Sequence, residues 1–286
     1  MKRIAVIPNK QRDVEYTNTK KLIALLAGRA KVLMHEAEEI RIDGAEYIDA
    51  ETMYKNADLA IVLGGDGSIL SVAEPLSKAN VPILGINLGH LGFLAAIEPE
   101  NMAEAVDALL AGEYRIEKRS MLHAEFARKG RANASFDALN DIVISRASFT
   151  KLLSLQVYTD GALLDEFVAD GVIISTATGS TAYSLSAGGP ILAPELSAML
   201  ITPICPHNMQ SRPIVMPFGH TLSVKVVRKD CEGTFISCDG KSICTMTEND
   251  ILHIEKSAYE TCIIQMDSKS FYATLKDKLN KQHIIR

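Results

Sequence analysis

The run Gly64-Gly65-Asp66-Gly67-Ser68 combines glycines with one acid and one hydroxyl. Glycines let the backbone approach a ligand closely, and the N–H groups of such a turn bind phosphate oxygens. A carboxylate repels phosphate, so Asp66 makes sense if it faces a hydroxyl group as a hydrogen-bond and proton acceptor. The run therefore predicts a phosphate loop formed by Gly64, Gly65, Gly67 and Ser68, with Asp66 as catalytic carboxylate. An ordinary surface turn is the alternative.

Residues 171–194 form a second candidate region, because they contain no charged side chain. The length would suffice for a membrane span, but seven Ser/Thr, four Gly and two Pro are poorly tolerated in lipid. Small hydroxyl side chains supply many short donors and acceptors with little bulk. The tract therefore predicts a binding segment for a polyhydroxylated ligand that carries a base. Asn140-Asp141 adds an amide and a carboxylate of the kind that hold ribose hydroxyls.

The elements around the glycine run alternate between strand and helix. Short apolar runs predict strands at 3–8, 31–35, 58–63 and 81–87, and helical spacing is found at 14–30, 68–79 and 99–112. Ser68 is the expected N-cap of the second of these helices. This alternation predicts an α/β domain with a doubly wound, mostly parallel sheet, and the glycine run then lies at the carboxyl end of a buried strand.

The pattern changes near Tyr114, after which period-two segments recur and predict an all-β-rich second domain. Residues 271–281 again have helical spacing. We expect an α/β domain at 1–113, a β-rich domain at 114–266 that contains the hydroxyl-rich tract, and a C-terminal segment, 267–286, that packs back on the first. The expected strands of the second domain are 121–127, 141–146, 154–159, 221–227, 234–238, 251–255 and 261–265.

Composition excludes several classes of protein. The formal net charge of −5 over 286 residues disfavours nucleic-acid binding, which needs a positive face. Five cysteines without a Cys-x-x-Cys pair disfavour a disulfide framework or a structural zinc site. The N-terminal apolar stretch is too short for a signal peptide, so we expect a cytoplasmic protein without membrane association.

Several motifs together resemble the NAD kinase family. They span most of the chain, and the run at 178–190 is highly specific, whereas Gly-Gly-Asp-Gly also occurs in phosphofructokinases and in lipid kinases of the diacylglycerol type. The matching motifs are Gly64–Ser68, Asn87–Phe93 (NLGHLGF), Asn140-Asp141, Asp170-Gly171, Thr178–Pro190 (TGSTAYSLSAGGP) and Thr202–His207 (TPICPH).

The resemblance implies a role for each matching position. Asp66 corresponds to the proton acceptor, Phe93 to a residue near the adenosine, and Asp170 to an acid near the nicotinamide that can reach across a subunit interface. Three positions depart from the commoner family pattern: Asp141 is often Glu, Val168 is Arg in some bacterial members, and Lys241 is often Gln. The implied NAD-binding residues are Asp66, Gly67, Phe93, Asn140, Asp141, Lys151, Asp170, Thr178, Thr181, Ala182, Tyr183, Ser184, Leu185 and Ser186.

The resemblance also implies a reaction, in which ATP or polyphosphate phosphorylates the adenosine 2′-hydroxyl of NAD to give NADP. A divalent metal ion, Mg²⁺ or Mn²⁺, is expected with the phosphoryl donor and without a dedicated protein site. A homodimer or homotetramer is the expected assembly. Two alternatives are a lipid or sugar kinase that shares the glycine loop and a noncatalytic NAD-sensing module.

Overall fold

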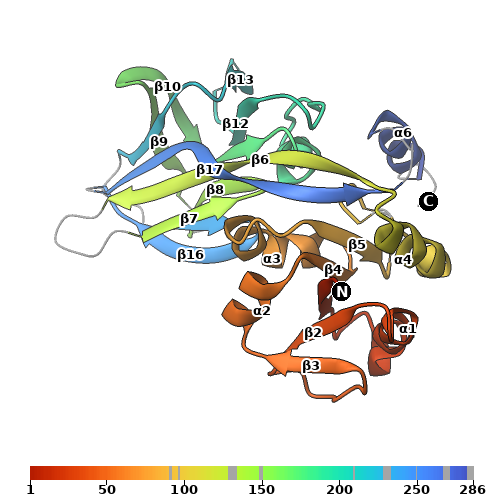
Figure 1. Ribbon diagram of the computed structural model, residues 1–286. Coiled ribbons are helices and arrows are strands. Elements are labelled where there is room, and N and C mark those ends of the chain that lie inside the picture. Colours follow the sequence, from red (N-terminus) through yellow and green to blue (C-terminus); the bar gives the residue numbers. More distant parts are fainter. Residues whose placement is uncertain are drawn as a thin grey trace. The chain divides into compact units, whose positions relative to one another are not determined.

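The computed structural model describes residues 1–89, 92–95, 97–127, 134–147, 151–208, 210–227, 233–248, 250–266 and 271–281 (Figure 1). The chain forms two compact units. Unit 1 contains Met1–Lys118 and Thr261–Arg286, and unit 2 contains Arg119–Glu260. Two strands, β6 (Arg115–Ala127) and β17 (Ile251–Gln265), include residues of both units.

Unit 1 is built on a parallel sheet with the strand order β3-β2-β1-β4-β5-β17. The central strand β4 is buried along its whole length, as expected for a strand covered on both faces. The strand order reverses between β1 and β4, so the segments that follow these two strands lie at the switch point of the sheet. The strands that precede β17 are β1 (Arg3–Pro8), β2 (Lys31–His35), β3 (Ala45–Ile48), β4 (Leu59–Gly64) and β5 (Ile83–Asn87).

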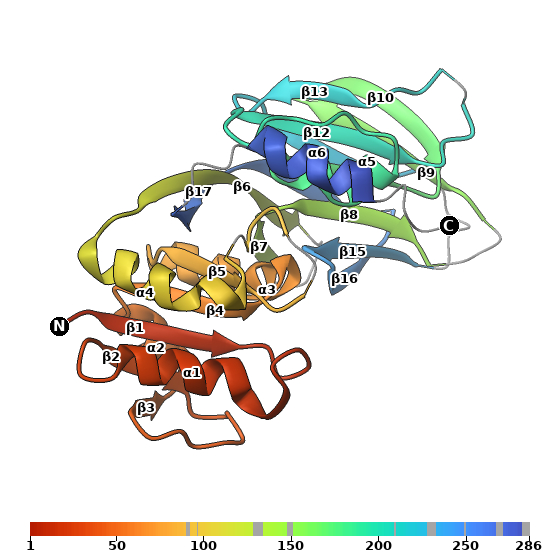
Figure 2. The same cartoon turned by 90° about the vertical axis from the view of Figure 1, so that its right-hand side faces the viewer.

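Helices cover both faces of this sheet. Figure 2 shows α1 (Thr17–Leu26) and α4 (Met102–Ala111) in front of the strands and α2 (Ala50–Asn56) and α3 (Asp66–Lys78) behind them. The apolar faces of α1 and α4 share one core cluster with the strands. Short 3-10 turns, Val14–Tyr16 and Pro99–Asn101, precede α1 and α4. The C-terminal helix α6 spans Phe271–Lys281.

The start of α3 differs from its prediction. The N-cap is Gly65, and Asp66, Gly67 and Ser68 already form the first helical turn. Ser68 is therefore not the cap, although its hydroxyl still accepts a long hydrogen bond of 3.4 Å from the Gly65 N–H. The glycine turn between β4 and α3 is thus one residue long, and Asp66 stands at the N-terminus of a 13-residue helix.

Unit 2 consists of two antiparallel sheets. One has the order β13-β12-β11-β8-β15-β16, and the other contains β10, β9, β14 and the first residues of β17, with the pair β6–β7 beside this path. The two 3-10 and α turns after β11 are η3 (Gly179–Thr181) and α5 (Tyr183–Ser186). The remaining strands are β7 (Ala134–Ala138), β8 (Asp141–Arg146), β9 (Leu153–Thr159), β10 (Ala162–Ala169), β11 (Gly171–Thr176), β12 (Ala198–Ile204), β13 (Ile214–Pro217), β14 (Leu222–Val226), β15 (Thr234–Cys238) and β16 (Lys241–Met246).

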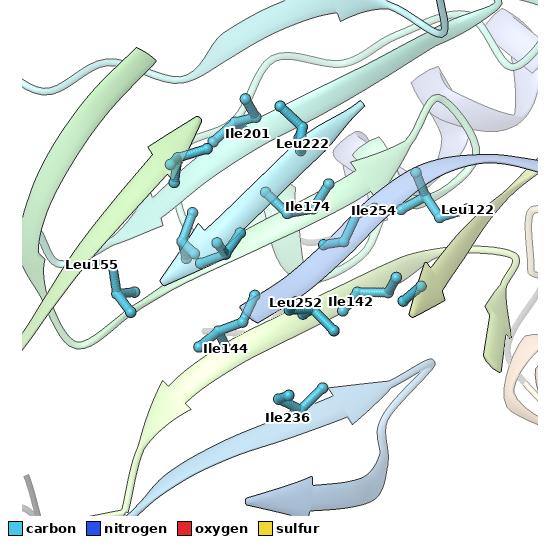
Figure 3. Close-up of a cluster of buried hydrophobic side chains, with 14 of the residues drawn as sticks. Leu122, Ile142, Ile144, Leu155, Ile174, Ile201, Leu222, Ile236, Leu252 and Ile254 are labelled. Carbon is cyan, nitrogen blue, oxygen red and sulfur yellow. The ribbon is translucent and has the colours of Figure 1, made fainter. Parts of the chain in front are cut away.

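The core of unit 2 lies between its two sheets. Alternate residues of each strand point inward, as Ile142 and Ile144 do in β8 and Leu222 and Val224 do in β14. Figure 3 shows Ile142, Ile144 and Leu222 among the side chains of this core. The core is apolar, and it combines aliphatic side chains with four phenylalanines, Phe126, Phe136, Phe167 and Phe218.

The predicted fold class is confirmed, with a parallel α/β sheet in unit 1 and antiparallel sheets in unit 2. Residues 251–255 and 261–265, predicted as two strands, belong to the single 15-residue strand β17. The strands β3, β7, β10, β12, β13 and β16 were not predicted. Within the part of the chain that the structure describes, no helix is long and apolar enough to cross a membrane.

Candidate functional site

Asp66 is positioned by the turn between β4 and α3. Its carboxylate accepts three hydrogen bonds from consecutive backbone amides: Phe93 N to Oδ2 (2.7 Å), and Leu94 N and Ala95 N to Oδ1 (3.0 Å each). A carboxylate at a helix N-terminus is also favoured by the helix dipole. The side chain remains 28% exposed. Asp66 is therefore rigidly oriented and still reachable by a ligand.

The acceptor positions of Asp66 are unequally used. A carboxylate offers about four lone-pair directions, two on each oxygen. The amides of Leu94 and Ala95 use both directions on Oδ1, and the amide of Phe93 uses one on Oδ2. Oδ2 thus keeps one acceptor direction, which is the capacity that a hydroxyl nucleophile requires.

Gly92 explains the glycine density of the second turn, Asn87–Phe93, of which His90 and Leu91 lie outside the described residues. A Cβ atom at position 92 would collide with the carboxylate of Asp66. Only glycine therefore allows the amides that follow it to surround Asp66 at hydrogen-bonding distance. The two glycine-rich segments recognised in the sequence form one structure in unit 1.

The segment after β1 adds residues that the sequence did not identify. Asn9 donates from Nδ2 to the Ser68 hydroxyl (2.8 Å), and its backbone N–H bonds to Leu63 O (2.8 Å). Arg12 extends along the glycines, since a Cβ atom at Gly65 would lie 3.0 Å from its Nη1. Arg12 therefore supplies a guanidinium beside the phosphate loop, at the switch point of the sheet.

Helix α6 contacts Phe93 and Asp66. The Phe271 ring lies 5.7 Å from the Phe93 ring, centroid to centroid. The Lys278 ammonium lies 4.1 Å from the Phe93 centroid and 4.0 Å from Asp66 Oδ2. Phe93, expected near the adenosine, is therefore engaged by α6 through its ring and by Asp66 through its backbone.

Asn140 and Asp141 occupy the turn that leads into β8 in unit 2, and Asp239 braces this turn. The Asp239 carboxylate accepts three consecutive amides, from Leu139 (2.8 Å), Asn140 (2.8 Å) and Asp141 (3.1 Å). Asp239 has a positive φ of 47° in the turn between β15 and β16. The sequence pattern places Asp239 and Gly240 in a hairpin turn, but it did not predict this contact.

Burial changes the acid–base properties of this pair. Burial raises the pKa of Asp141 to about 7, and the nearby Asp239 carboxylate adds to the effect. Burial also raises the pKa of Asp239, against the opposing effect of its three amide hydrogen bonds. Asp141 itself is only 5% exposed. With a pKa of about 7, Asp141 is protonated in a large share of the molecules at neutral pH. A protonated carboxyl group can donate as well as accept a hydrogen bond.

Several hydroxyl groups of the uncharged tract form hydrogen bonds within unit 2. Thr176 donates from Oγ1 to Leu139 O (2.7 Å), Ser180 donates to Ala177 O (2.7 Å), and the Ser184 and Thr202 hydroxyls share a hydrogen bond of 2.8 Å. Gly179 lies so close to the Asn140 carbonyl that a Cβ atom would not fit there. These bonds fix the tract against the Asn140 turn, and the Ser184 hydroxyl is turned inside.

The predicted NAD-binding residues of unit 2 fall into two groups. Thr178 and Tyr183 follow the end of β11 that pairs with Asp141, where Ser175 is the partner of Asp141. Tyr183 is 46% exposed and free of the core, whereas Thr178 is buried and accepts from Arg119 Nη1 at 3.5 Å. Thr181, Ala182 and Leu185 are partly exposed, and Ser186 is exposed.

Asp170 belongs to the second group, at the opposite end of β11. It forms an ion pair with Arg146 (Nε to Oδ1, 2.8 Å). Leu153 pairs with Ala169, which places Lys151 toward the same end. The six residues of β11 separate this group from the Asn140 turn by roughly 17 Å of strand. Within unit 2, the structure does not bring Asp170 and Lys151 together with Asn140 and Asp141.

A divalent cation would find few protein ligands. Across the described ranges, no group of three or more His, Cys, Asp or Glu side chains is arranged to hold a metal ion. Asp66, the acid of the loop, already spends most of its acceptor capacity on backbone amides.

The fold and the loop define the class first: an open α/β unit that binds a phosphorylated ligand at the carboxyl ends of its strands, joined to a β unit. The sequence matches the ATP-NAD kinase N-terminal domain over residues 10–114 and the ATP-NAD kinase C-terminal domain over residues 139–266. The chain is 38% identical over 284 residues to the NAD kinase of Caldanaerobacter subterraneus subsp. tengcongensis, which covers 99% of this chain and 100% of the relative. The chain therefore belongs to the ATP-NAD kinase family.

Further similarities agree with this assignment. The NAD kinase of Moorella thermoacetica is 38% identical over 98% of this chain and 90% of its own. An NAD kinase from Archaeoglobus fulgidus, solved in complex with ATP, has a TM-score of 0.74 at 25% identity and covers 97% of this chain and 98% of its own. The yeast NADH kinase, solved with NADH, shares the fold with a TM-score of 0.85 at 23% identity, over 100% of this chain and 88% of its own.

Proposed function

We propose that this protein is an enzyme that transfers the terminal phosphoryl group of ATP to the adenosine 2′-hydroxyl of NAD, giving ADP and NADP. The observation that carries the proposal is the Asp66 carboxylate, which three backbone amides hold in place and whose Oδ2 keeps one acceptor direction. That direction suits a hydroxyl nucleophile. The relatives named NAD kinase are similar to this chain over nearly its full length.

The chemistry needs positioning more than a strong base. In a loose phosphoryl-transfer transition state the attacking hydroxyl loses its proton late. The 2′-oxygen forms a bond to the γ-phosphorus while the bond to the oxygen of ADP breaks, and the proton moves to Asp66 Oδ2. Before that step the carboxylate orients the hydroxyl. The N-terminal amides of α3, the glycine turn and Arg12 provide positive electrostatic potential for the phosphates.

The metal enters as part of the donor. We infer that Mg²⁺ or Mn²⁺, when bound, would be held by the phosphates of the nucleotide and would supply positive charge against them. The residues of the loop then contact the phosphates through Gly65, Gly67 and Arg12, and Asp66 is reserved for the hydroxyl. Polyphosphate would meet the same groups, and it is the alternative donor in this proposal.

The two groups of unit 2 have separate roles in the proposal. Asn140, Asp141 and the exposed ring of Tyr183 bind the dinucleotide near the adenosine, with Thr178, Thr181, Ala182, Ser184, Leu185 and Ser186 shaping that segment. Asp170 and Lys151 lie at the other end of the strands. The family resemblance implies that Asp170 serves a neighbouring subunit, and its distance from Asn140 along β11 agrees with that role. This requires a homodimer or a homotetramer.

One assay separates this proposal from its alternatives. The protein is incubated with NAD, ATP and Mg²⁺, and NADP is measured with a dehydrogenase specific for NADP. We expect NADP to form in proportion to the ADP released. Calorimetric binding of NAD without turnover would instead indicate an NAD-sensing module. Phosphorylation of diacylglycerol or of a sugar phosphate, with NAD left unchanged, would indicate a kinase of another family that shares the loop.

The organisation of the molecule in solution is part of the proposal. Residues 1–113 would supply the phosphate loop and 114–266 the NAD-binding domain, with 267–286 serving the first. The assembly would be a homodimer or homotetramer in the cytoplasm, without nucleic acid or membrane partners. Light scattering after size exclusion measures the assembly, and a monomer with full activity would contradict a shared site.

A further inference from the structure

The Lys278 ammonium lies beside the only reactive carboxylate of the proposed loop. Its Nζ is 4.0 Å from Asp66 Oδ2, which is beyond hydrogen-bonding distance, and 4.1 Å from the centroid of the Phe93 ring. The ammonium is therefore held near Asp66 by the ring face and by long-range attraction. An oxygen atom of a ligand can contact both groups without breaking a hydrogen bond between them.

The position of Lys278 follows from the helix that carries it. Phe271 and Lys278 are seven residues apart, which is two helical turns, so both project from the same face of α6. Both contact Phe93, whose backbone N–H binds Asp66. Phe271 and Phe93 thus fix the face of α6 that presents the ammonium to Asp66.

Lys278 is held at an energetic cost, which a purely structural lysine would avoid. The side chain is 30% exposed, and burial lowers the pKa of Lys278 against the opposing attraction of Asp66. Lys276 of the same helix is exposed. A half-buried cation beside a carboxylate is a common arrangement at functional sites.

The charge that moves during the reaction favours a cation at this place. Before transfer, Asp66 faces a neutral hydroxyl, but afterwards the same oxygen carries a phosphoryl group with negative charge. Until the proton reaches it, the Asp66 carboxylate repels the approaching phosphoryl group, and the glycine loop contains no lysine to offset this repulsion. An ammonium within 4.0 Å of Asp66 Oδ2 lies where it can contact the transferred group.

We propose that Lys278 is a further catalytic residue, whose ammonium binds the phosphoryl group as it passes from the donor to the 2′-oxygen and then holds it as the 2′-phosphate of NADP. This inference rests on the proposed function. In this proposal Lys278 binds the negative charge of the transferred phosphoryl group. NAD lacks this group, whereas the transition state and the product carry it. Lys278 therefore contributes to kcat and to the affinity for NADP, and not to the affinity for NAD.

The test compares Lys278→Met, Lys278→Arg and Lys276→Met with the full-length wild type. Methionine keeps the apolar stem that packs on Phe93 but removes the charge. We expect Lys278→Met to lower kcat by ~10²-fold and to weaken NADP binding about tenfold in calorimetry, with NAD affinity unchanged within about twofold, the usual scale for one charge-assisted contact. Lys278→Arg keeps the charge and should restore most of both losses, and Lys276→Met should behave as the wild type.

The outcomes are distinct. A wild type that forms no NADP contradicts the proposed function itself. An active wild type whose Lys278→Met variant keeps its kcat and its preference for NADP overturns the role of Lys278. Equal losses of NAD and NADP affinity would also overturn it, because they indicate a structural role. Thermal unfolding checks that the variant folds, and Lys278→Gln replaces it if it does not.

Discussion

Asp66 and Asp239 form the same local arrangement in different units. Each is followed by glycine, and each carboxylate accepts hydrogen bonds from three consecutive backbone amides of a distant segment. Their surroundings differ. Asp66 is at a helix N-terminus, and an ammonium lies 4.0 Å from its Oδ2. Asp239 lies beside Asp141 instead, and burial disfavours the ionised form of both of these carboxyl groups. The amide contacts alone therefore do not identify a catalytic acid.

The comparison separates two uses of a braced carboxylate. At Asp66 the amides hold the acid while one oxygen keeps an acceptor direction toward a ligand. At Asp239 the three amides belong to the turn that contains Asn140 and Asp141. The Asp239 carboxylate therefore stabilises this turn and, through it, the positions of Asn140 and Asp141. We infer that charge at Asp66 matters for the reaction, while charge at Asp239 matters for the folded turn.

The largest effect is expected for Asp66→Asn, which keeps the size of the side chain but removes the proton acceptor and leaves one of the three backbone N–H groups without its acceptor. We expect kcat to fall by ~10²-fold to ~10³-fold, the scale of lost general-base assistance, with NAD affinity within about threefold of the wild type. NADP formation and calorimetry measure the two quantities, and Asp277→Asn on the exposed face of α6 is the control. Retained turnover in Asp66→Asn would remove this acid from the chemistry.

The next effect concerns pH and Asp141. The pKa of Asp141 is about 7 in the folded state and 3.8 in its ordinary environment, so the folded protein holds this proton more tightly. The resulting stabilisation is complete below about pH 4 and is lost as pH rises through 7. Asp141→Asn does not titrate there. Relative to this variant, the wild type should lose roughly 2 to 3 kcal/mol of unfolding free energy between pH 5 and pH 8.

Thermal unfolding of both proteins across this pH range provides the measurement. A change of 1 kcal/mol shifts the Tm of a domain of this size by about 2–4 °C. The Tm difference should therefore move in favour of Asp141→Asn by several degrees and level off above pH 7. Parallel curves for the two proteins would show that Asp141 titrates normally.

Asp239→Asn should have a smaller effect, and on binding rather than on chemistry. The amide nitrogen of asparagine cannot accept a hydrogen bond, so one backbone N–H of the Leu139–Asp141 segment loses its acceptor, at a cost of about 2 kcal/mol. We expect the KM for NAD to rise several-fold and kcat at saturating NAD to change by less than about twofold. Urea unfolding and steady-state kinetics measure both. A fall in kcat at unchanged KM would place Asp239 in the chemistry and end the contrast with Asp66.

The sequence predicted those features that depend on neighbouring residues. The parallel sheet and the position of Asp66 followed from apolar runs that end in glycines, because both signals are local. The contacts that hold these two acids were not predicted, because they join residues that are far apart in the sequence. Asp239 accepts a hydrogen bond from an amide 99 residues away. Lys278, which lies near Asp66, comes from the C-terminal helix. Arg12 was missed for the same reason, since its position depends on the strand order that places β1 beside β4.

The alternation of apolar and polar residues failed to predict the full length of strand β17. In β17 two consecutive residues, Glu255 and Lys256, are exposed, so the alternation of buried and exposed residues is interrupted although the strand continues. The hydroxyl-rich tract was predicted to face a ligand, but Ser180 and Ser184 are buried and bonded within the unit. Composition indicated that the tract is polar, and it could not indicate which hydroxyls are already satisfied.

The smallest effect is expected at Lys241, the first residue of β16. The charge of Lys241 lowers the pKa of Asp239 and so opposes the effect of burial. Lys241 is exposed at the start of β16, where water screens such an interaction. Lys241→Gln should therefore change the free energy of unfolding at pH 7 by less than about 0.5 kcal/mol, with the small loss confined to pH values at which Asp239 is ionised. Urea unfolding at pH 5 and pH 8 measures this, and a loss above about 1 kcal/mol at pH 8 would show that Lys241 shares with the three amides the task of holding Asp239.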